Sequence, residues 1–228
     1  MRFLLAFVAV LLIGQNCFGQ DRPNIILINL DDADVDLLAP AEIQNRFPEM
    51  EEFALQGINF TNMHVTTSLC TPSRASLFRG QYAHNTRIRG NGGGRVRDNG
   101  FLGGHQAYVE LGHDHNDIST WMQDIGCRTM MVGKYITGDV VDVVPPGWDD
   151  FYSSRGNKYF GAKRFTNRFA AEGRFETIDN GLSRTIEEMN DALRLIDEQR
   201  AFRPEQPFFL YLAPLNSHKP GRLSLIHI

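Results

Sequence analysis

The sequence predicts an α/β protein with a mostly parallel central sheet flanked by helices. Residues 24–30 form a nearly continuous apolar run, which is the pattern of a strand buried on both faces, and further strands are expected over 128–132 and 207–213. Helical patterns lie between these strands, over 119–125 and 182–196. Strands that alternate with helices favour a parallel sheet, because a parallel connection needs a crossover element.

Each expected element has its own signal. The first strand stops at Asp31, and the second stops before Gly133. The helix over 119–125 is ended by Gly126. In the later helix, apolar side chains recur every four or three residues opposite charged ones, so we expect this stripe to pack on the sheet. The stripe consists of Leu182, Ile186, Met189, Leu193 and Ile196.

The composition limits the class of protein. Of 228 residues, 42% are hydrophobic and 22% are charged, which is enough apolar material for the core of one large or two small domains. Lys and Arg number 23 against 27 Asp and Glu, so the net charge is -4 and no basic excess predicts binding to nucleic acid. Three cysteines do not make a disulfide framework.

The N-terminus has the pattern of a signal peptide over residues 1–19. A positive Arg2 precedes the apolar run 3–13, and small residues follow near the expected cleavage point. The run is too short for a permanent bilayer anchor, so we expect no stable membrane insertion. We expect an exported protein, periplasmic or secreted, and lysosomal or extracellular in a eukaryote. After cleavage Cys70 and Cys127 remain, and a disulfide between them is one possibility.

Charged residues follow the expected strands at their carboxyl ends. Asp31 and Asp32 follow the first strand, Lys134 follows the second, and a polar segment follows Ala213. Functional groups of open α/β sheets gather at this edge, so we expect an active site there. Two adjacent carboxylates either form a solvated turn or bind a hard divalent cation such as Ca²⁺ or Mg²⁺.

Residues 70–77, with the sequence CTPSRASL, are the most informative segment. Pro72 suits the first turn of a helix, which puts Cys70 at a helix N-terminus, where a developing anion is favoured. Arg74 lies four residues on and therefore on the same helix face. By itself this pattern is consistent with a thiolate nucleophile of low pKa. A cysteine protease would also need a histidine base and a third group, and no local pattern provides them.

The segment resembles the sulfatase signature C-x-P-S-R, in which the cysteine is oxidised to Cα-formylglycine. The approach from Arg22 to Asp31-Asp32 is similar to the metal-binding opening of that family, and Gly133-Lys134-Tyr135 resembles its G-K-[WY] motif. Residues 144–148, VPPGW, and 82–85, YAHN, resemble the N-acetylglucosamine-6-sulfatase and heparan endosulfatase branch. The resemblance covers about residues 22 to 220.

The resemblance implies an alkaline-phosphatase-like sulfatase fold and the hydrolysis of sulfuric esters. Formylglycine made from Cys70 by a formylglycine-generating enzyme would supply the nucleophile as its hydrate. Asp31, Asp32 and residue 70 would hold one Ca²⁺, Arg74 would stabilise the hydrate, and Lys134 would neutralise the sulfuryl group. His218 matches a family histidine that contacts the sulfate or the leaving oxygen. The implied substrate is a sulfated saccharide, of the N-acetylglucosamine-6-sulfate type or a related polysaccharide sulfate.

Several features depart from the family pattern. Ile136-Thr137 stands where that branch has Leu-Asn, which bears on fine specificity. Family members are generally longer, so residues 20–222 are interpreted as the N-terminal part of a catalytic domain whose C-terminal part is missing, and 223–228 as a non-native or truncated tail. We expect this fragment alone to be inactive. His113 and His115 are expected in a polar loop rather than at a metal. A phosphate or phosphonate monoester hydrolase of the same superfamily and a non-catalytic sugar-binding relative are the alternatives.

Overall fold

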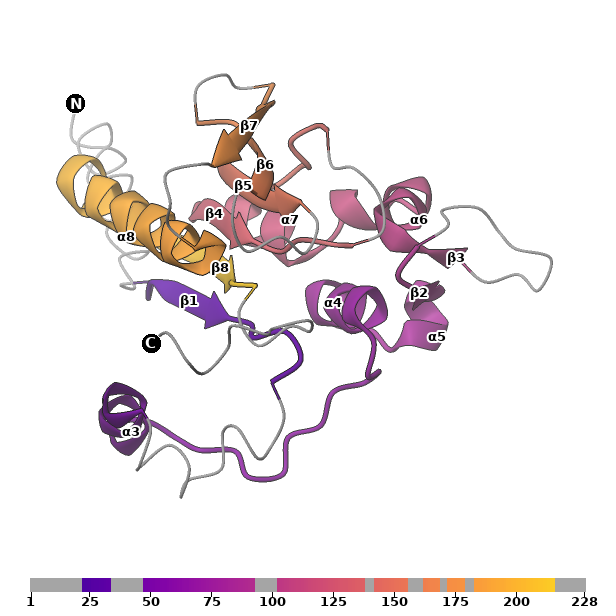
Figure 1. Ribbon diagram of the computed structural model, residues 1–228, viewed down its shortest axis with the longest axis horizontal. Coiled ribbons are helices and arrows are strands. Elements are labelled where there is room, and N and C mark those ends of the chain that lie inside the picture. Colours follow the sequence, from indigo (N-terminus) through magenta and orange to yellow (C-terminus); the bar gives the residue numbers. More distant parts are fainter. Residues whose placement is uncertain are drawn as a thin grey trace, which may run out of the picture.

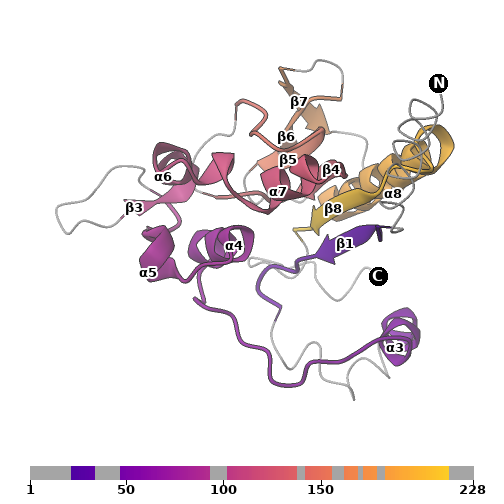
Figure 2. The same cartoon turned by 180° about the vertical axis from the view of Figure 1, so that it is seen from behind.

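Six strands form one mixed sheet in the order β1-β8-β4-β5-β6-β7, with helices on both faces (Figures 1 and 2). The first four strands of that order run parallel, and β6 and β7 are antiparallel to their neighbours, which confirms the mostly parallel α/β architecture. The computed structural model describes residues 22–33, 47–92, 102–137, 142–155, 162–168, 172–178 and 183–215. The expected signal peptide and the tail 223–228 lie outside these ranges. The strands of the main sheet are β1 (Ile25–Ile28), β4 (Arg128–Gly133), β5 (Asp150–Arg155), β6 (Ala162–Thr166), β7 (Arg174–Ile178) and β8 (Phe208–Ala213). The other elements are α3 (Pro48–Leu55), α4 (Cys70–Arg79), α5 (Ala83–Thr86), β2 (Ile88–Gly90), β3 (Leu102–Gly103), α6 (Gly104–Glu110), the 3₁₀ helix η1 (His113–His115), α7 (Ile118–Asp124) and α8 (Arg184–Phe202).

The strand β8 is inserted between β1 and β4. Ile28 is in register with Leu212, and Gly133 with Ala213. The backbone N–H of Asn29 donates to the carbonyl of Leu212 at 2.9 Å, and that of Lys134 donates to the carbonyl of Ala213 at 2.8 Å. The carboxyl ends of β1, β8 and β4 therefore meet at one edge of the sheet, as expected for parallel strands.

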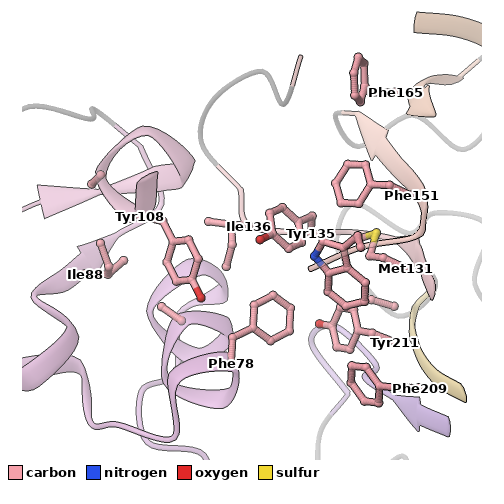
Figure 3. Packing of buried hydrophobic residues seen from close by; sticks show 14 of the residues in the cluster. Phe78, Ile88, Tyr108, Met131, Tyr135, Ile136, Phe151, Phe165, Phe209 and Tyr211 are labelled. Atoms are coloured by element: carbon pink, nitrogen blue, oxygen red, sulfur yellow. The ribbon is translucent and has the colours of Figure 1, made fainter. Parts of the chain in front are cut away.

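The strand β8 is buried on both faces, as its unbroken apolar sequence predicts. Phe209, Tyr211 and Ala213 belong to a core cluster shared with α4, α6 and α7, whereas the alternate side chains pack with Ala192 and Leu195 of α8. Figure 3 shows the first cluster, in which Phe78 of α4 lies close to Tyr211. The sheet thus has a helical layer on each side.

The prediction that the first strand is buried on both faces is wrong. In β1, Ile26 is 48% exposed and Ile28 is 54% exposed. The strand stands at the edge of the described sheet and pairs there with β8 on one side. Hydrophobic sequence alone does not distinguish an edge strand from a central one, because burial depends on what lies beside it.

The predicted apolar stripe of the later helix is wrong for three of its members. In α8, Ile186, Met189 and Leu193 are exposed, whereas Ile196 is partly buried against the second core cluster. Leu182 lies outside the described residues. The buried face of the helix carries polar side chains that find partners: Glu188 accepts from Ser154 and from the backbone N–H of Leu215, and Asp191 pairs with Arg164. Paired polar groups can be buried at little cost, so they compete with apolar ones for the inner face. The residues of this buried face are Arg184, Glu188, Asp191, Ala192, Leu195 and Gln199.

The helix α3 buries none of its residues and is drawn apart from the sheet in both views (Figures 1 and 2). Phe53, Leu55, Ile58 and Phe60, in and just after this helix, are each more than two-thirds exposed. Among the helices that the structure describes, none has both the length and the apolar character that crossing a bilayer requires.

Candidate active site

Cys70 is the first residue of α4, as the position of Pro72 predicts. Leu69 before it is extended, and the backbone N–H of Ser73 donates to the Leu69 carbonyl at 3.0 Å. Proline costs nothing in this turn because its missing N–H would have no partner within the helix. The helix ends at Gly80, which adopts the left-handed conformation. Cys70 is half-buried and its thiol is free, and so is the thiol of Cys127, so the possible disulfide is not formed.

Asp31, Asp32 and Cys70 come together at the carboxyl edge of the sheet. One potential ligand atom from each lies within 4.8 Å of the others, and no second such group occurs within the described ranges. Asp31 is buried and Asp32 is exposed in a left-handed conformation, which aspartate tolerates better than most residues. Two carboxylates suit a hard cation such as Ca²⁺, whereas a thiol is a soft ligand that suits it poorly. The group fits Ca²⁺ better when residue 70 carries oxygen in place of sulfur.

Two buried cations surround Asp31. The ammonium group of Lys134 forms an ion pair with Asp31 Oδ2, and Nη2 of Arg74 lies 3.6 Å from Asp31 Oδ1. Arg74 Nη1 donates to the backbone carbonyl of Lys134 at 2.6 Å, which ties the two cations together. Charges of both signs gathered in a buried place are typical of a site for a charged ligand, since single buried charges are costly.

Tyr211 and Asn29 are parts of this arrangement that the sequence reasoning missed. The phenol oxygen of Tyr211 accepts hydrogen bonds from Arg74 Nη1 at 2.7 Å and from Asn29 Nδ2 at 2.8 Å. Burial raises the pKa of Tyr211, so this phenol stays protonated at ordinary pH. The signals were present: a hydroxyl inside an otherwise apolar strand needs a partner, and Asn29 interrupts an apolar run.

A second set of missed residues holds the first turn of α4. The backbone N–H of Thr71 donates to Asn91 Oδ1 at 2.9 Å. The Thr71 hydroxyl donates to the backbone carbonyl of Thr137 at 3.1 Å and also pairs with the Thr137 hydroxyl. Thr137 is thus hydrogen-bonded to the residue next to Cys70 and helps to hold the first turn of α4.

The remaining candidate residues lie elsewhere. His218 falls outside the described residues. His113 is buried with its Nε2 2.8 Å from the Thr86 carbonyl, whereas His115 is exposed. Neither belongs to the metal-ligand group found among the described residues. Cys127 is buried in the same core cluster as Met131 and Tyr211.

Comparison with protein families and with curated proteins gives one consistent result. The family model described as Sulfatase matches residues 23–224. An extracellular sulfatase SULF-1 homolog of Drosophila melanogaster is 33% identical over 138 residues, and an arylsulfatase of Volvox carteri is 35% identical over 141 residues. The N-acetylglucosamine-6-sulfatase of Homo sapiens is 24% identical over 217 residues, or 89% of this chain.

The matches cover a large part of this chain but a small part of each relative. The Drosophila and Volvox matches span 60% and 58% of this chain, and 11% and 20% of the relatives. The human match spans 35% of that relative. The chain therefore corresponds to about a third or less of the length of these curated relatives.

Solved structures share the fold. A sulfatase from Pseudoalteromonas has a TM-score of 0.65 at 16% identity, with 94% of this chain and 48% of that chain covered. A protein solved in complex with its substrate D-glucosamine-2-N,6-O-disulfate has a TM-score of 0.60 at 20% identity, with 87% of this chain and 35% of that chain covered. At these identities the likeness establishes the architecture, and the alkaline-phosphatase-like expectation for the fold is confirmed.

Proposed function

We propose that this chain, which belongs to the sulfatase family, carries the nucleophile of a sulfuric ester hydrolase that acts on a sulfated carbohydrate. We propose that it also carries residues that bind the metal and the anionic substrate. The observation that carries the proposal is the meeting of Asp31, Asp32 and Cys70 within 4.8 Å at the sheet edge. Arg74 and Lys134 lie directly beside this group. A sulfate ester is an anion, and this group supplies both cationic donors and a place for a cation.

Residue 70 is proposed to be Cα-formylglycine in the mature protein. The change oxidises the β-carbon to an aldehyde and breaks its bond to sulfur. A separate formylglycine-generating enzyme would therefore have to supply the oxidant and take up the released sulfur. When present, the hydrated aldehyde supplies a hydroxyl nucleophile for attack on sulfur. Cys70 is suited to this role because it is half-buried at the start of α4. A ligand at the carboxyl edge of the sheet could therefore contact it.

Asp31, Asp32 and residue 70 are proposed to hold one Ca²⁺. Such an ion supplies a positive charge that lowers the pKa of a bound hydroxyl and polarises a sulfate oxygen. Ca²⁺ takes six to eight oxygens, more than these residues provide, so further ligands are needed for full activity. For that reason we infer that residues 20–222 alone turn over no substrate.

Arg74 and Lys134 are proposed to neutralise negative charge on the sulfuryl group and on the nucleophile. Both are buried, and hydrogen bonds from buried cations are stronger than those in water. Nη2 of Arg74 has no hydrogen-bond acceptor among the described residues, so it is available to an anionic oxygen. His218 is proposed, from the resemblance, to contact the sulfate or the leaving oxygen.

The carbohydrate class and the site of action are proposed from the relatives. The human relative is named as an N-acetylglucosamine-6-sulfatase, and the Drosophila relative is named as an extracellular sulfatase homolog. Together with the leader pattern of residues 1–19, they support an exported enzyme that meets sulfated saccharides outside the cytoplasm. N-acetylglucosamine-6-sulfate is the first substrate to test.

To test this function, the protein encoded by the complete reading frame is expressed with and without a formylglycine-generating enzyme. Mass spectrometry of the peptide around residue 70 reports the modification, and kinetics compare 4-nitrophenyl sulfate, 4-nitrophenyl phosphate and N-acetylglucosamine-6-sulfate. We expect sulfate release that depends on the modifying enzyme and disappears in Cys70→Ala. Cys127→Ala is the matched control, because that cysteine lies in the core.

The possible outcomes separate the rival functions. A strong preference for the phosphate ester would favour a phosphate monoester hydrolase. Saccharide binding without hydrolysis of any of the three esters would favour a non-catalytic relative. Turnover that survives Cys70→Ala would show that the nucleophile is misassigned. Residues 20–222 alone form a further arm, for which we expect no turnover.

A further inference from the structure

The two terminal nitrogens of the Arg74 guanidinium differ: Nη1 donates two hydrogen bonds, and Nη2 donates none to the described residues. Nη1 donates both to the Lys134 carbonyl at 2.6 Å and to the Tyr211 phenol at 2.7 Å. Nη2 lies 3.6 Å from Asp31 Oδ1 and has no hydrogen-bond acceptor within the part of the chain that the structure describes, although the residue is only 2% exposed. A buried donor without an acceptor costs free energy, so Nη2 suits a ligand that supplies the acceptor.

Tyr211 is built into the centre of the fold. It lies on β8, between β1 and β4, and is fully buried. Its ring meets Phe78 of α4 edge to face, with the ring centroids 4.9 Å apart (Figure 3). Its phenol oxygen accepts a second hydrogen bond, from Asn29 Nδ2 at 2.8 Å, two residues before Asp31. One oxygen atom thus links β8 to both α4 and the end of β1.

We propose that Tyr211 is a positioning residue, whose phenol oxygen fixes the guanidinium of Arg74 so that Nη2 stays directed toward Asp31 and open to an anionic ligand. The inference rests on the proposed function and adds a residue to it. Without the phenol oxygen, Nη1 keeps one acceptor, the Lys134 carbonyl, and Asn29 Nδ2 loses the acceptor shown here. A planar group held by one hydrogen bond rotates more freely than one held by two.

The consequence for turnover follows from where Arg74 acts. A cation that stabilises developing charge contributes mainly to kcat, and small misplacement of such a group is costly. For Tyr211→Phe we expect kcat to fall about tenfold or more, with KM changed by less than about threefold. Phenylalanine keeps the ring that packs on Phe78, so the core should be retained.

Tyr152→Phe is the matched control. Tyr152 is a buried tyrosine on β5 whose phenol oxygen accepts from an arginine, Nη2 of Arg194, at 2.8 Å. It packs in the cluster against α8, on the opposite face of the sheet. The same chemical change there should leave kcat unchanged.

The experiment is a double-mutant cycle in the protein from the complete reading frame, with 4-nitrophenyl sulfate as substrate. If Tyr211 acts through Arg74, Tyr211→Phe has little further effect on kcat in an Arg74→Met background. The inference is overturned if Tyr211→Phe alone leaves kcat at the wild-type value, if it lowers kcat by the same factor in both backgrounds, or if Tyr152→Phe has an equal effect. Urea unfolding of each variant shows whether the fold is kept.

A second readout does not depend on turnover. Nitrogen-15 NMR of the Arg74 guanidinium reports how freely it rotates, and we expect faster rotation in Tyr211→Phe and no change in Tyr152→Phe. Unchanged rotation in both variants would overturn the positioning role. A wild-type protein that releases sulfate from neither 4-nitrophenyl sulfate nor N-acetylglucosamine-6-sulfate would defeat the proposed function. The NMR comparison would still decide whether Tyr211 holds Arg74.

Discussion

Lys134 and Asp31 form an ion pair across 103 residues of the chain, and each side chain is only 6% exposed. Asp31 follows β1 and Lys134 follows β4, and β8 lies between these strands. The pair therefore connects two strands that do not touch each other in the sheet. Both members belong to the proposed site, Asp31 among the metal ligands and Lys134 among the cations beside them.

Lys134→Met should destabilise the chain by about 3 kcal/mol, because removal of one partner leaves a buried carboxylate with less compensation. Urea unfolding measures the change in the free energy of unfolding. The double variant with Asp31→Asn should recover part of the loss, since the uncompensated charge is then gone. Lys163→Met, at an exposed position on β6, is the control and should change stability little. Equal losses in the two lysine variants would contradict the prediction.

Calcium in the millimolar range should raise the thermal unfolding midpoint of this chain, because a ligand that binds the folded state stabilises it. The calcium-dependent part of the shift should be absent in Asp31→Asn and in Asp32→Asn, which remove carboxylate ligands of the proposed site. Asp124→Asn, at an exposed position at the end of α7, should keep the shift. Differential scanning fluorimetry with and without EDTA is sufficient. A shift that survives in the Asp31 and Asp32 variants would place the calcium elsewhere.

Gly133→Ala should destabilise the chain by about 3 kcal/mol or more, through backbone strain and overlap. Gly133 has a φ of 105°, and a Cβ there would overlap the carbonyl group of Ala213. Gly57→Ala is a suitable comparison, because its Cβ would meet its nearest atom at 3.9 Å. Thermal unfolding of both variants tests the prediction, and it fails if they unfold at the same temperature.

Stability should fall as the pH is lowered through the range of His113. Burial lowers the pKa of His113, and this effect outweighs the opposing effect of the hydrogen bond to the Thr86 carbonyl. The unfolded state therefore takes up a proton at a higher pH than the folded state does. Stability present above about pH 6.5 is lost as the pH falls toward the lower pKa of the folded state.

His113→Gln checks this pH dependence. A glutamine amide can still donate to the Thr86 carbonyl but does not titrate, so the variant should lose less stability between about pH 8 and pH 5 than the wild type. His115→Gln alters an exposed imidazole and should follow the wild type. Identical pH profiles for wild type and His113→Gln would contradict the assignment.

The sequence alone predicts the position and type of those elements that have a strong local pattern. The strands β4 and β8, the helix α7 ended by Gly126, and the start of α4 at Cys70 were all predicted and are all present. The gathering of Asp31, Lys134 and Ala213 at one edge was also predictable, because parallel strands share a carboxyl edge. Roles for Asp31, Asp32, Cys70, Arg74, Lys134 and His218 came from the resemblance and stay proposals.

The errors concern what lies against each element. The exposure of β1 depends on its place at the sheet edge, and the inner face of α8 depends on partners such as Arg164, which come from other strands. Tyr211 and Asn29 were missed for a related reason: each stands out as a polar residue in an apolar run, but the sequence does not show that they are partners across 182 residues. Periodicity reports the character of a face, and only the assembled fold decides which face turns inward.

The insertion of β8 between β1 and β4 has a consequence for the order of events during synthesis. Strand β8, residues 208–213, is the common neighbour of β1 and β4, so these two strands cannot be joined in the main sheet until β8 has left the ribosome. Contacts of such long sequence separation form slowly, because a long loop must be closed before any of them is gained. We therefore expect Cys70 and Asp31 to reach their final juxtaposition only after β8 has paired with both β1 and β4.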